Sequence, residues 1–197
     1  CGTAAGKVFV HCPHDRTLDS LNNLRFLNIN RRLTAIAAGR LDPSRDRDVL
    51  VVGSQNNVFA YDVESNSDVF FREVSDNVTA LAIGTAGSSP KPLVFVGGNC
   101  SVQGFDASGT ESYWSVTGDT VTSLAVTDFG ATGRPDLVVG SADFELRFFN
   151  DEEMVHESAE AERPTLLCSM PAPSFGYVCI VMYATPHMVF MCCHCQF

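Results

Sequence analysis

The chain has 197 residues, of which 45% are hydrophobic and 18% charged, a composition typical of a globular protein with a substantial apolar core. Twenty-three acidic against thirteen basic residues give a formal net charge of −10, and a field of that sign repels phosphate backbones, which excludes nucleic acid as a partner. Half of the eight cysteines lie in the last nineteen residues, unlike a secreted disulfide framework, and this favours a reducing compartment.

The first predicted element covers residues 6–11, which resemble residues 57–61, so we expect the chain to begin within the second half of a repeat unit. Three complete units follow. In each, an apolar run ends in a glycine and a second apolar run follows, and these glycines, Gly53, Gly97 and Gly140, are 44 and 43 residues apart. A period of about 40 to 45 residues made of short strands is typical of propeller blades.

Each complete unit divides into four predicted strands, the number that one blade needs. The second strands are continuous apolar runs, which predicts burial on both faces. Small residues on the first strands, Ala35, Ala80 and Ser123, suit a crowded centre. The glycines that end the second strands suit hairpins with permissive backbone angles. Tyr113 and Trp114, on a fourth strand, are predicted to pack between blades.

The predicted fold class is all-β, an incomplete β-propeller of four-stranded antiparallel blades with a repeat of about 44 residues. The units are a partial one at 1–32, complete ones at 33–77, 78–120 and 121–163, and the start of another at 164–177. Residues 178–197 are predicted to be an aberrant Cys-rich apolar tail. Because repeats are stabilised by their neighbours, we expect such an open arc to be marginally stable alone and prone to association.

The loop of residues 128–136 has an outline similar to the calcium loops of integrin-like propellers. Calcium takes about six to eight oxygen ligands, and of the expected acids only Asp128 and Asp136 remain, so we predict a weak remnant and no metal site. The cluster of residues 192–195 is too compact for tetrahedral zinc. Catalytic spacings and cofactor motifs are not found. The uncharged run of residues 175–184 is shorter than a membrane span.

Several stretches of the chain resemble one family. They are Gly6–His11, Asn66–Val74, Gly97–Phe105 and Val116–Asp119, within a match that extends from Gly6 to Tyr177. The family is that of the Bardet-Biedl syndrome 2 proteins, subunits of the BBSome, the coat-like complex of cilia, and the likeness is to their amino-terminal propeller. After Tyr177 the chain departs from the family pattern, as a shifted reading frame or an unspliced intron would produce.

The resemblance implies a non-enzymatic scaffold subunit without a cofactor, which supports assembly of the BBSome and trafficking of membrane proteins to and from the cilium. The implied partners are other BBSome subunits, notably the Bardet-Biedl syndrome 7 and 9 proteins, with membrane-protein cargo reached indirectly and no direct membrane insertion. The implied location is the cytoplasm, the cilium, the ciliary membrane and the basal body. Two alternatives stay open. One is an extracellular integrin-like calcium-binding propeller for adhesion or ligand binding, and the other is a quinone-cofactor dehydrogenase. The sequence lacks both the calcium ligands that the first needs and the metal and cofactor ligands that the second needs.

Overall fold

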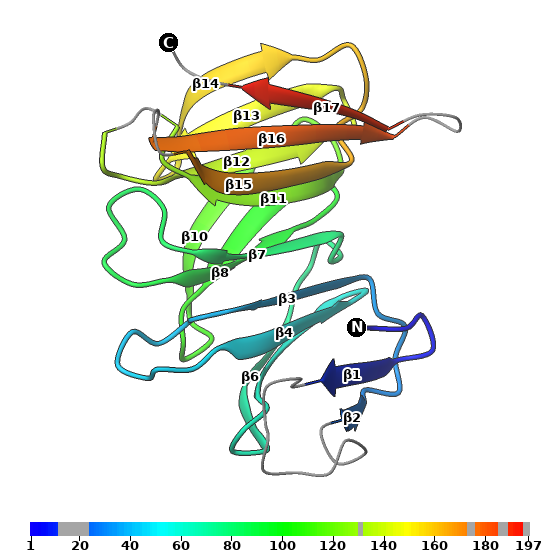
Figure 1. The fold of residues 1–197 in the computed structure, drawn as a ribbon. Helices are drawn as coiled ribbons and strands as arrows, with labels where there is room; N and C mark the ends of the chain where they lie inside the picture. The colour runs from blue at the N-terminus through cyan, green and yellow to red at the C-terminus, as the bar shows by residue number, and fades with distance from the viewer. Residues whose placement is uncertain (12–23, 130–131, 173–175, 185–188, 195–197) are drawn as a thin grey trace.

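The structure is a computed structural model, and it describes residues 1–11, 24–129, 132–172, 176–184 and 189–194 (Figure 1). The described residues form antiparallel β-sheets, which are stacked from β1 and β2 at the bottom of Figure 1 to β14 and β17 at the top. This confirms the predicted all-β class with four-stranded antiparallel blades. In this part of the chain there is no helix with the length and apolar character that crossing a bilayer requires.

Three four-stranded sheets repeat one topology, in which each strand pairs antiparallel with the strand before it. Their strands are β3 (Ala35–Gly39), β4 (Val49–Ser54), β5 (Asn57–Asp62) and β6 (Ser67–Glu73); β7 (Ala80–Gly84), β8 (Leu93–Gly97), β9 (Ser101–Phe105) and β10 (Glu111–Val116); and β11 (Val121–Thr127), β12 (Asp136–Ser141), β13 (Glu145–Asn150) and β14 (Glu153–Ala159). We call these sheets blades A, B and C.

Two smaller sheets flank the three blades. Before blade A, β1 (Lys7–His11) pairs with β2 (Leu24–Asn28), and after blade C, β15 (Leu166–Ala172), β16 (Gly176–Ala184) and β17 (Val189–His194) form a three-stranded sheet. The first strands β3, β7, β11 and β15 lie beside one another in series, while β6, β10 and β14 are edge strands (Figure 1). The sheets therefore follow one another face to face, in chain order.

The core consists of apolar layers between successive sheets. Val51 and Val52 are neighbours on β4, yet Val51 packs with Val94 of blade B whereas Val52 packs with Val8 of β1. All residues of β4, β8 and β12 are buried, as their apolar runs predict. Each fully buried valine contributes about 1.5–3 kcal/mol relative to an exposed one. Successive blades therefore stabilise one another through both faces of their second strands.

The glycines at the ends of the second strands have a different role from the one predicted. Gly53, Gly97 and Gly140 have no positive φ, so the expected need for a permissive turn angle is wrong. Instead, a methyl group at Gly97 would lie 2.4 Å from Cγ1 of Val121, the first residue of the next blade. A methyl group at Gly53 would meet Val78 at the same distance. Glycine is required here because the next blade approaches the backbone closely.

The two aromatic residues of β10 have opposite environments. Tyr113 is 6% exposed and packs edge-on against Phe95 of its own blade, with ring centroids 5.3 Å apart, and it lies in an apolar cluster shared with Leu137 of blade C, as predicted for packing between blades. Burial raises the pKa of the Tyr113 phenol. The same prediction is wrong for Trp114, which is 51% exposed. Side chains alternate between the faces of a strand, and at this edge strand the face that carries Trp114 is left uncovered.

The small residues of the first strands are buried to different extents. Ala80 and Ser123 are buried and Ala35 is half-buried. The hydroxyl of Ser123 also accepts a hydrogen bond of 2.8 Å from the backbone nitrogen of Leu167, on the first strand of the next sheet. This hydrogen bond joins blade C to the three-stranded sheet that follows it.

Aspartates form the turns between the third and fourth strands of blades A and B. Asp62 Oδ1 accepts hydrogen bonds from the backbone nitrogens of Glu64 and Ser65, each at 3.1 Å. In blade B, Asp106 Oδ1 accepts from the backbone nitrogens of Ser108 at 2.8 Å and Thr110 at 2.9 Å. Such Asx turns hold the loop rigidly at the end of its strand. They position the residues that border the site described next.

Candidate functional site

The loop predicted to be a calcium remnant uses its two aspartates for hydrogen bonds within the protein. Asp128 accepts from the backbone nitrogens of Thr132, at 2.9 Å, and Gly133, at 2.7 Å. Asp136 is buried and accepts a 2.8 Å hydrogen bond from Asn150 Nδ2. The described residues contain no group of three or more acidic, His or Cys side chains arranged to hold a metal. Residues 130 and 131 lie outside the described part.

We expect millimolar calcium to leave the thermal unfolding midpoint of the chain unchanged, because both carboxylates already accept hydrogen bonds from protein groups. A ligand that binds only the folded state raises the midpoint. Thermal unfolding with added calcium and with a chelator measures this directly. A calcium-dependent rise that is abolished in Asp128→Asn would contradict the prediction and restore the calcium alternative.

Histidine and cysteine side chains are not assembled for catalysis in the described part of the chain. The ring of His156 is stacked on Phe129, with centroids 5.7 Å apart, and His11 is exposed at the end of β1. Cys100 is exposed in the turn between β8 and β9, where its backbone nitrogen donates to Asp76. The side chains of residues 192–195, the cluster considered for zinc, are not among the side chains that the structure describes.

Arg147 is the centre of a polar cluster on blade C. Its Nε lies 2.8 Å from Glu157 Oε1 and one terminal nitrogen lies 2.8 Å from Asp143 Oδ2. Its other terminal nitrogen donates a 2.7 Å hydrogen bond to the fully buried hydroxyl of Ser141. Burial would raise the pKa of Asp143, but hydrogen bonds from Arg147 and Ser141 outweigh it and hold that pKa below 3.8. These partners satisfy Arg147, which marks it as a structural residue.

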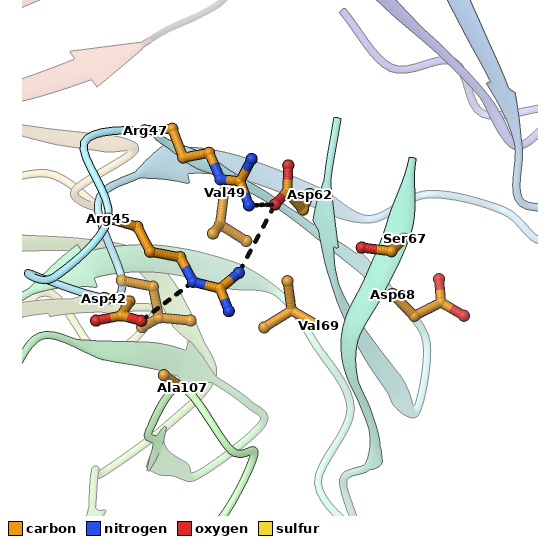
Figure 2. Close-up of a pocket in the computed structure, with 10 residues that line it drawn as sticks. Asp42, Arg45, Arg47, Val49, Asp62, Ser67, Asp68, Val69 and Ala107 are labelled. Carbon is orange, nitrogen blue, oxygen red and sulfur yellow. Dashed lines mark ion pairs between the residues drawn. The ribbon is translucent and has the colours of Figure 1, made fainter. Parts of the chain in front are cut away.

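A cavity of about 270 Å³ lies between blades A and B. Three segments border it: the loop before β4, the start of β6 and the turn after β9. The lining residues are Leu41, Asp42, Arg45, Arg47, Val49, Asp62, Ser67, Asp68, Val69 and Ala107 (Figure 2). Its apolar side is formed by Leu41, Val49, Val69 and Ala107, and the polar side carries two arginines. This is the candidate binding site of the described residues.

The two arginines of the cavity differ in their partners. A terminal nitrogen of Arg47 lies 2.6 Å from Asp62 Oδ2, a close ion pair. Arg45 lies between Asp42 and Asp62, at 3.4 and 3.9 Å, with its guanidinium directed toward Val69 (Figure 2). Both separations exceed those of charge-assisted hydrogen bonds, about 2.7–2.9 Å. Arg47 is therefore closely paired, whereas Arg45 makes only longer ion-pair contacts.

Sequence reasoning did not identify this cavity. One signal was present: a basic residue recurs shortly before each second strand, at Arg47, Lys91 and Arg134, spaced 44 and 43 residues apart. That recurrence marks the loop position. It does not reveal Arg45, because the approach of Asp42 and Asp62 to its guanidinium depends on how the loop folds against the end of β5.

Repeated four-stranded sheets, packed face to face around their first strands, place the chain in the class of β-propeller blade arrays. Two family descriptions match its sequence: ciliary BBSome complex subunit 2, N-terminal, over residues 1–84, and the middle region of the same subunit over residues 123–180. The chain belongs to the family of ciliary BBSome complex subunit 2.

Curated relatives have the same family name. BBSome complex member BBS2 of Danio rerio is 46% identical over 187 residues, which cover 89% of this chain. The Homo sapiens protein of that name is 44% identical over the same share of the chain, and bbs-2 of Caenorhabditis elegans is 36% identical over 77%. The chain spans about a quarter of the length of the vertebrate relatives, 26% of each.

A solved structure with a similar fold is the crystal structure of BBS1N in complex with ARL6DN, soaked with mercury. Its TM-score is 0.68 at 14% sequence identity, and the match covers 92% of this chain and 56% of that one. At this identity the likeness concerns the fold alone, and it agrees with the blade topology described above.

Proposed function

We propose that the chain forms part of a non-enzymatic scaffold subunit of the BBSome, which supports assembly of the complex and trafficking of membrane proteins to and from the cilium. The observation that carries the proposal is the 46% identity to BBSome complex member BBS2 over 89% of the chain. Blade arrays present extended surfaces, and the described side chains do not assemble a catalytic centre, which suits a scaffold.

The partners that we propose are other BBSome subunits, notably the Bardet-Biedl syndrome 7 and 9 proteins, with membrane-protein cargo contacted indirectly. The subunit would then be located in the cytoplasm, the cilium, the ciliary membrane and the basal body. The exposed Trp114 and Val116 on the edge strand β10 are of the kind that protein interfaces cover, because aromatic and apolar side chains are enriched there. The comparisons give no support to the extracellular calcium-binding alternative.

A chimera tests this proposal. Residues 1–177 of this chain replace the aligned region of the Danio rerio relative, and the full-length chimera is expressed in ciliated cells that lack their own subunit 2. We expect purification of the chimera to recover the other BBSome subunits, including the syndrome 7 and 9 proteins, and ciliary entry of membrane cargo to be restored.

The matched control is the same chimera with Gly97→Val, which places a branched side chain where Val121 already lies within 2.4 Å of a methyl position. We expect this variant to recover little or none of the complex. A wild-type chimera that accumulates to the level of the natural relative and still recovers no subunit above background would overturn the proposal.

A further inference from the structure

One face of blade A carries a row of three side chains with oxygen atoms, which we call the polar row. Ser54, Asn57 and Glu73 lie opposite one another on β4, β5 and β6. Side chains directly opposite on antiparallel strands share a face, with Cβ atoms about 4.5–5.5 Å apart. Val52, two residues before Ser54, packs with Val8 of β1. Because side chains alternate along a strand, the polar row lies on the face of blade A toward the N-terminal sheet.

Two oxygen atoms of the polar row are buried without a hydrogen-bond donor. Ser54 is 1% exposed and Asn57 is 8% exposed. Among the described residues, neither Ser54 Oγ nor Asn57 Oδ1 has a hydrogen-bond partner. Buried polar atoms are nearly always hydrogen-bonded, because a buried atom without a partner has lost its water and gained nothing in exchange. The polar row is therefore prepared to accept hydrogen bonds.

A cavity of about 450 Å³ lies beside Asn57. Its lining residues are Asn56, Asn57, Glu73, Val74 and Ser75. Glu73 is exposed, carries the only charge of this lining, and forms no ion pair in the described part of the chain. A carboxylate next to an unpartnered amide oxygen favours a cationic donor, and the net charge of −10 adds to this attraction.

Blade C shows which donor a serine at this position accepts. Ser141 ends β12 as Ser54 ends β4, and Arg147 is the third residue of β13 as Phe59 is the third residue of β5. Arg147 donates a 2.7 Å hydrogen bond to the Ser141 hydroxyl and pairs with Glu157 on the neighbouring strand. In blade C, therefore, a guanidinium from the same sheet satisfies the serine.

Blade A has two aromatic residues where blade C has this ion pair. Phe59 lies opposite Phe71, with ring centroids 4.9 Å apart, as Arg147 lies opposite Glu157. Phe71 is 43% exposed. The faces of aromatic rings attract cations, and the apolar stem of an arginine packs on such a surface. Blade A therefore keeps a surface that suits an arginine side chain but does not supply one.

The arginines closest in sequence do not supply the donor either. Arg72, next to Glu73, is directed to the other face of the blade, where its Nε donates to the backbone oxygen of Gly109. Arg31 and Arg32, between β2 and β3, are exposed, and their side chains make no hydrogen bond or ion pair in the described part of the chain.

We propose that the polar row of blade A binds one arginine side chain presented by a protein partner. The guanidinium donates to Asn57 Oδ1 and Ser54 Oγ and pairs with the carboxylate of Glu73. The stem of the arginine lies against Phe71. Arginine is favoured over lysine because its planar fork of N–H donors reaches several acceptors at once, whereas an ammonium is a compact point charge.

A protein source is favoured over the free amino acid, because free arginine would bring its own carboxylate toward Glu73. The site goes beyond the proposed function and does not depend on it.

The test uses the whole chain and four probes: N-acetyl-arginine N-methylamide, its citrulline and lysine analogues, and free arginine. Nuclear magnetic resonance follows the side-chain amide of Asn57. We expect a saturable shift with the arginine probe at millimolar concentrations, and binding at least about tenfold weaker for the citrulline analogue, which has the same shape without the charge. The lysine analogue and free arginine should each bind about threefold more weakly or worse.

Glu73→Gln and Glu73→Asp are a matched pair at an exposed position. We expect Glu73→Gln to weaken binding of the arginine probe about fivefold or more, whereas Glu73→Asp, which keeps the charge, stays within about twofold of the parent chain.

A second pair of variants transfers the ion pair of blade C to blade A. Phe59→Arg combined with Phe71→Glu should shift the resting Asn57 resonance and abolish the response to the probe. Phe59→Gln combined with the same Phe71→Glu has no cation and should keep the response. The remaining resonances of each variant report its folding.

The proposal is overturned by an absent or unsaturated Asn57 response, or by equal binding of the citrulline, lysine or free arginine probe. It is also overturned by a response that appears only after Arg31 and Arg32 are replaced by glutamine, which would make an arginine of the chain itself the ligand.

Discussion

Replacing Gly97 by alanine is expected to destabilise the chain by about 2–3 kcal/mol, although a strand glycine replaced by alanine would ordinarily be stabilising by several tenths. The new methyl group would lie 2.4 Å from Val121 Cγ1 and 2.8 Å from its Cβ. The backbone fixes the position of the valine Cβ, and a β-branched side chain has few alternative χ1 rotamers for its Cγ atoms. Urea unfolding and the fraction of soluble protein measure the loss.

The partner substitution distinguishes this clash from a general loss of stability. Val121→Ala removes buried methyl groups and is expected to cost about 2 kcal/mol by itself. In the double variant the 2.4 Å clash with Cγ1 is gone, although the Cβ at 121 still lies 2.8 Å away, so the double variant should cost at least about 1 kcal/mol less than the sum of the two single variants. Strictly additive costs would show that the two residues do not meet across the blades.

Replacing Arg147 by methionine is expected to cost about 2 kcal/mol or more near neutral pH, because it removes the guanidinium that pairs with the Asp143 and Glu157 carboxylates and donates to the buried Ser141 hydroxyl. The Arg147 side chain is 12% exposed and that of Asp143 is 24% exposed, so solvent screens this pair only in part. Urea unfolding at a series of pH values measures the difference between the variant and the parent chain.

The pH dependence follows from the lowered pKa of Asp143. A carboxyl whose pKa is lower in the folded chain stabilises the fold fully above its ordinary value of 3.8, and this contribution disappears as the pH falls through the lower folded value. The cost of Arg147→Met should therefore shrink below pH 3.8. Arg134→Met is the control, since Arg134 is exposed and its side chain has no ion pair in the described part of the chain. A cost that is independent of pH, or equal in the control, would show that the charge pair is not the cause.

Most of the fold could be predicted from the sequence, because a strand has a recognisable pattern among residues that are close together in the chain. Burial on both faces produces an uninterrupted apolar run such as that of β8, and a repeat of 44 and 43 residues at Gly53, Gly97 and Gly140 is sufficient to predict successive blades. The assignment to all-β blades and the family resemblance both rest on features of this kind. Packing was predicted for both aromatic residues of β10, and it holds for Tyr113 but not for Trp114.

The candidate site could not be predicted from local patterns in the sequence. Asp128 and Asp136 drew attention as acids in a familiar outline, yet each accepts hydrogen bonds from its surroundings. Arg45 gave no such signal. Its position between Asp42 and Asp62 is set by the folded loop and by the end of β5, and no local pattern of residues shows it.

By itself, the sequence determined that short strands recur at a fixed interval, that their second members are buried and that the chain resembles a single family, because each of these properties depends on residues close together along the chain. Only the tertiary structure decided why Gly97 must be glycine, why Trp114 is exposed and where a cavity remains, because these depend on how closely the next blade approaches. That approach is set by atoms about 24 residues away, those of Val121 against Gly97, and no local pattern of residues encodes it.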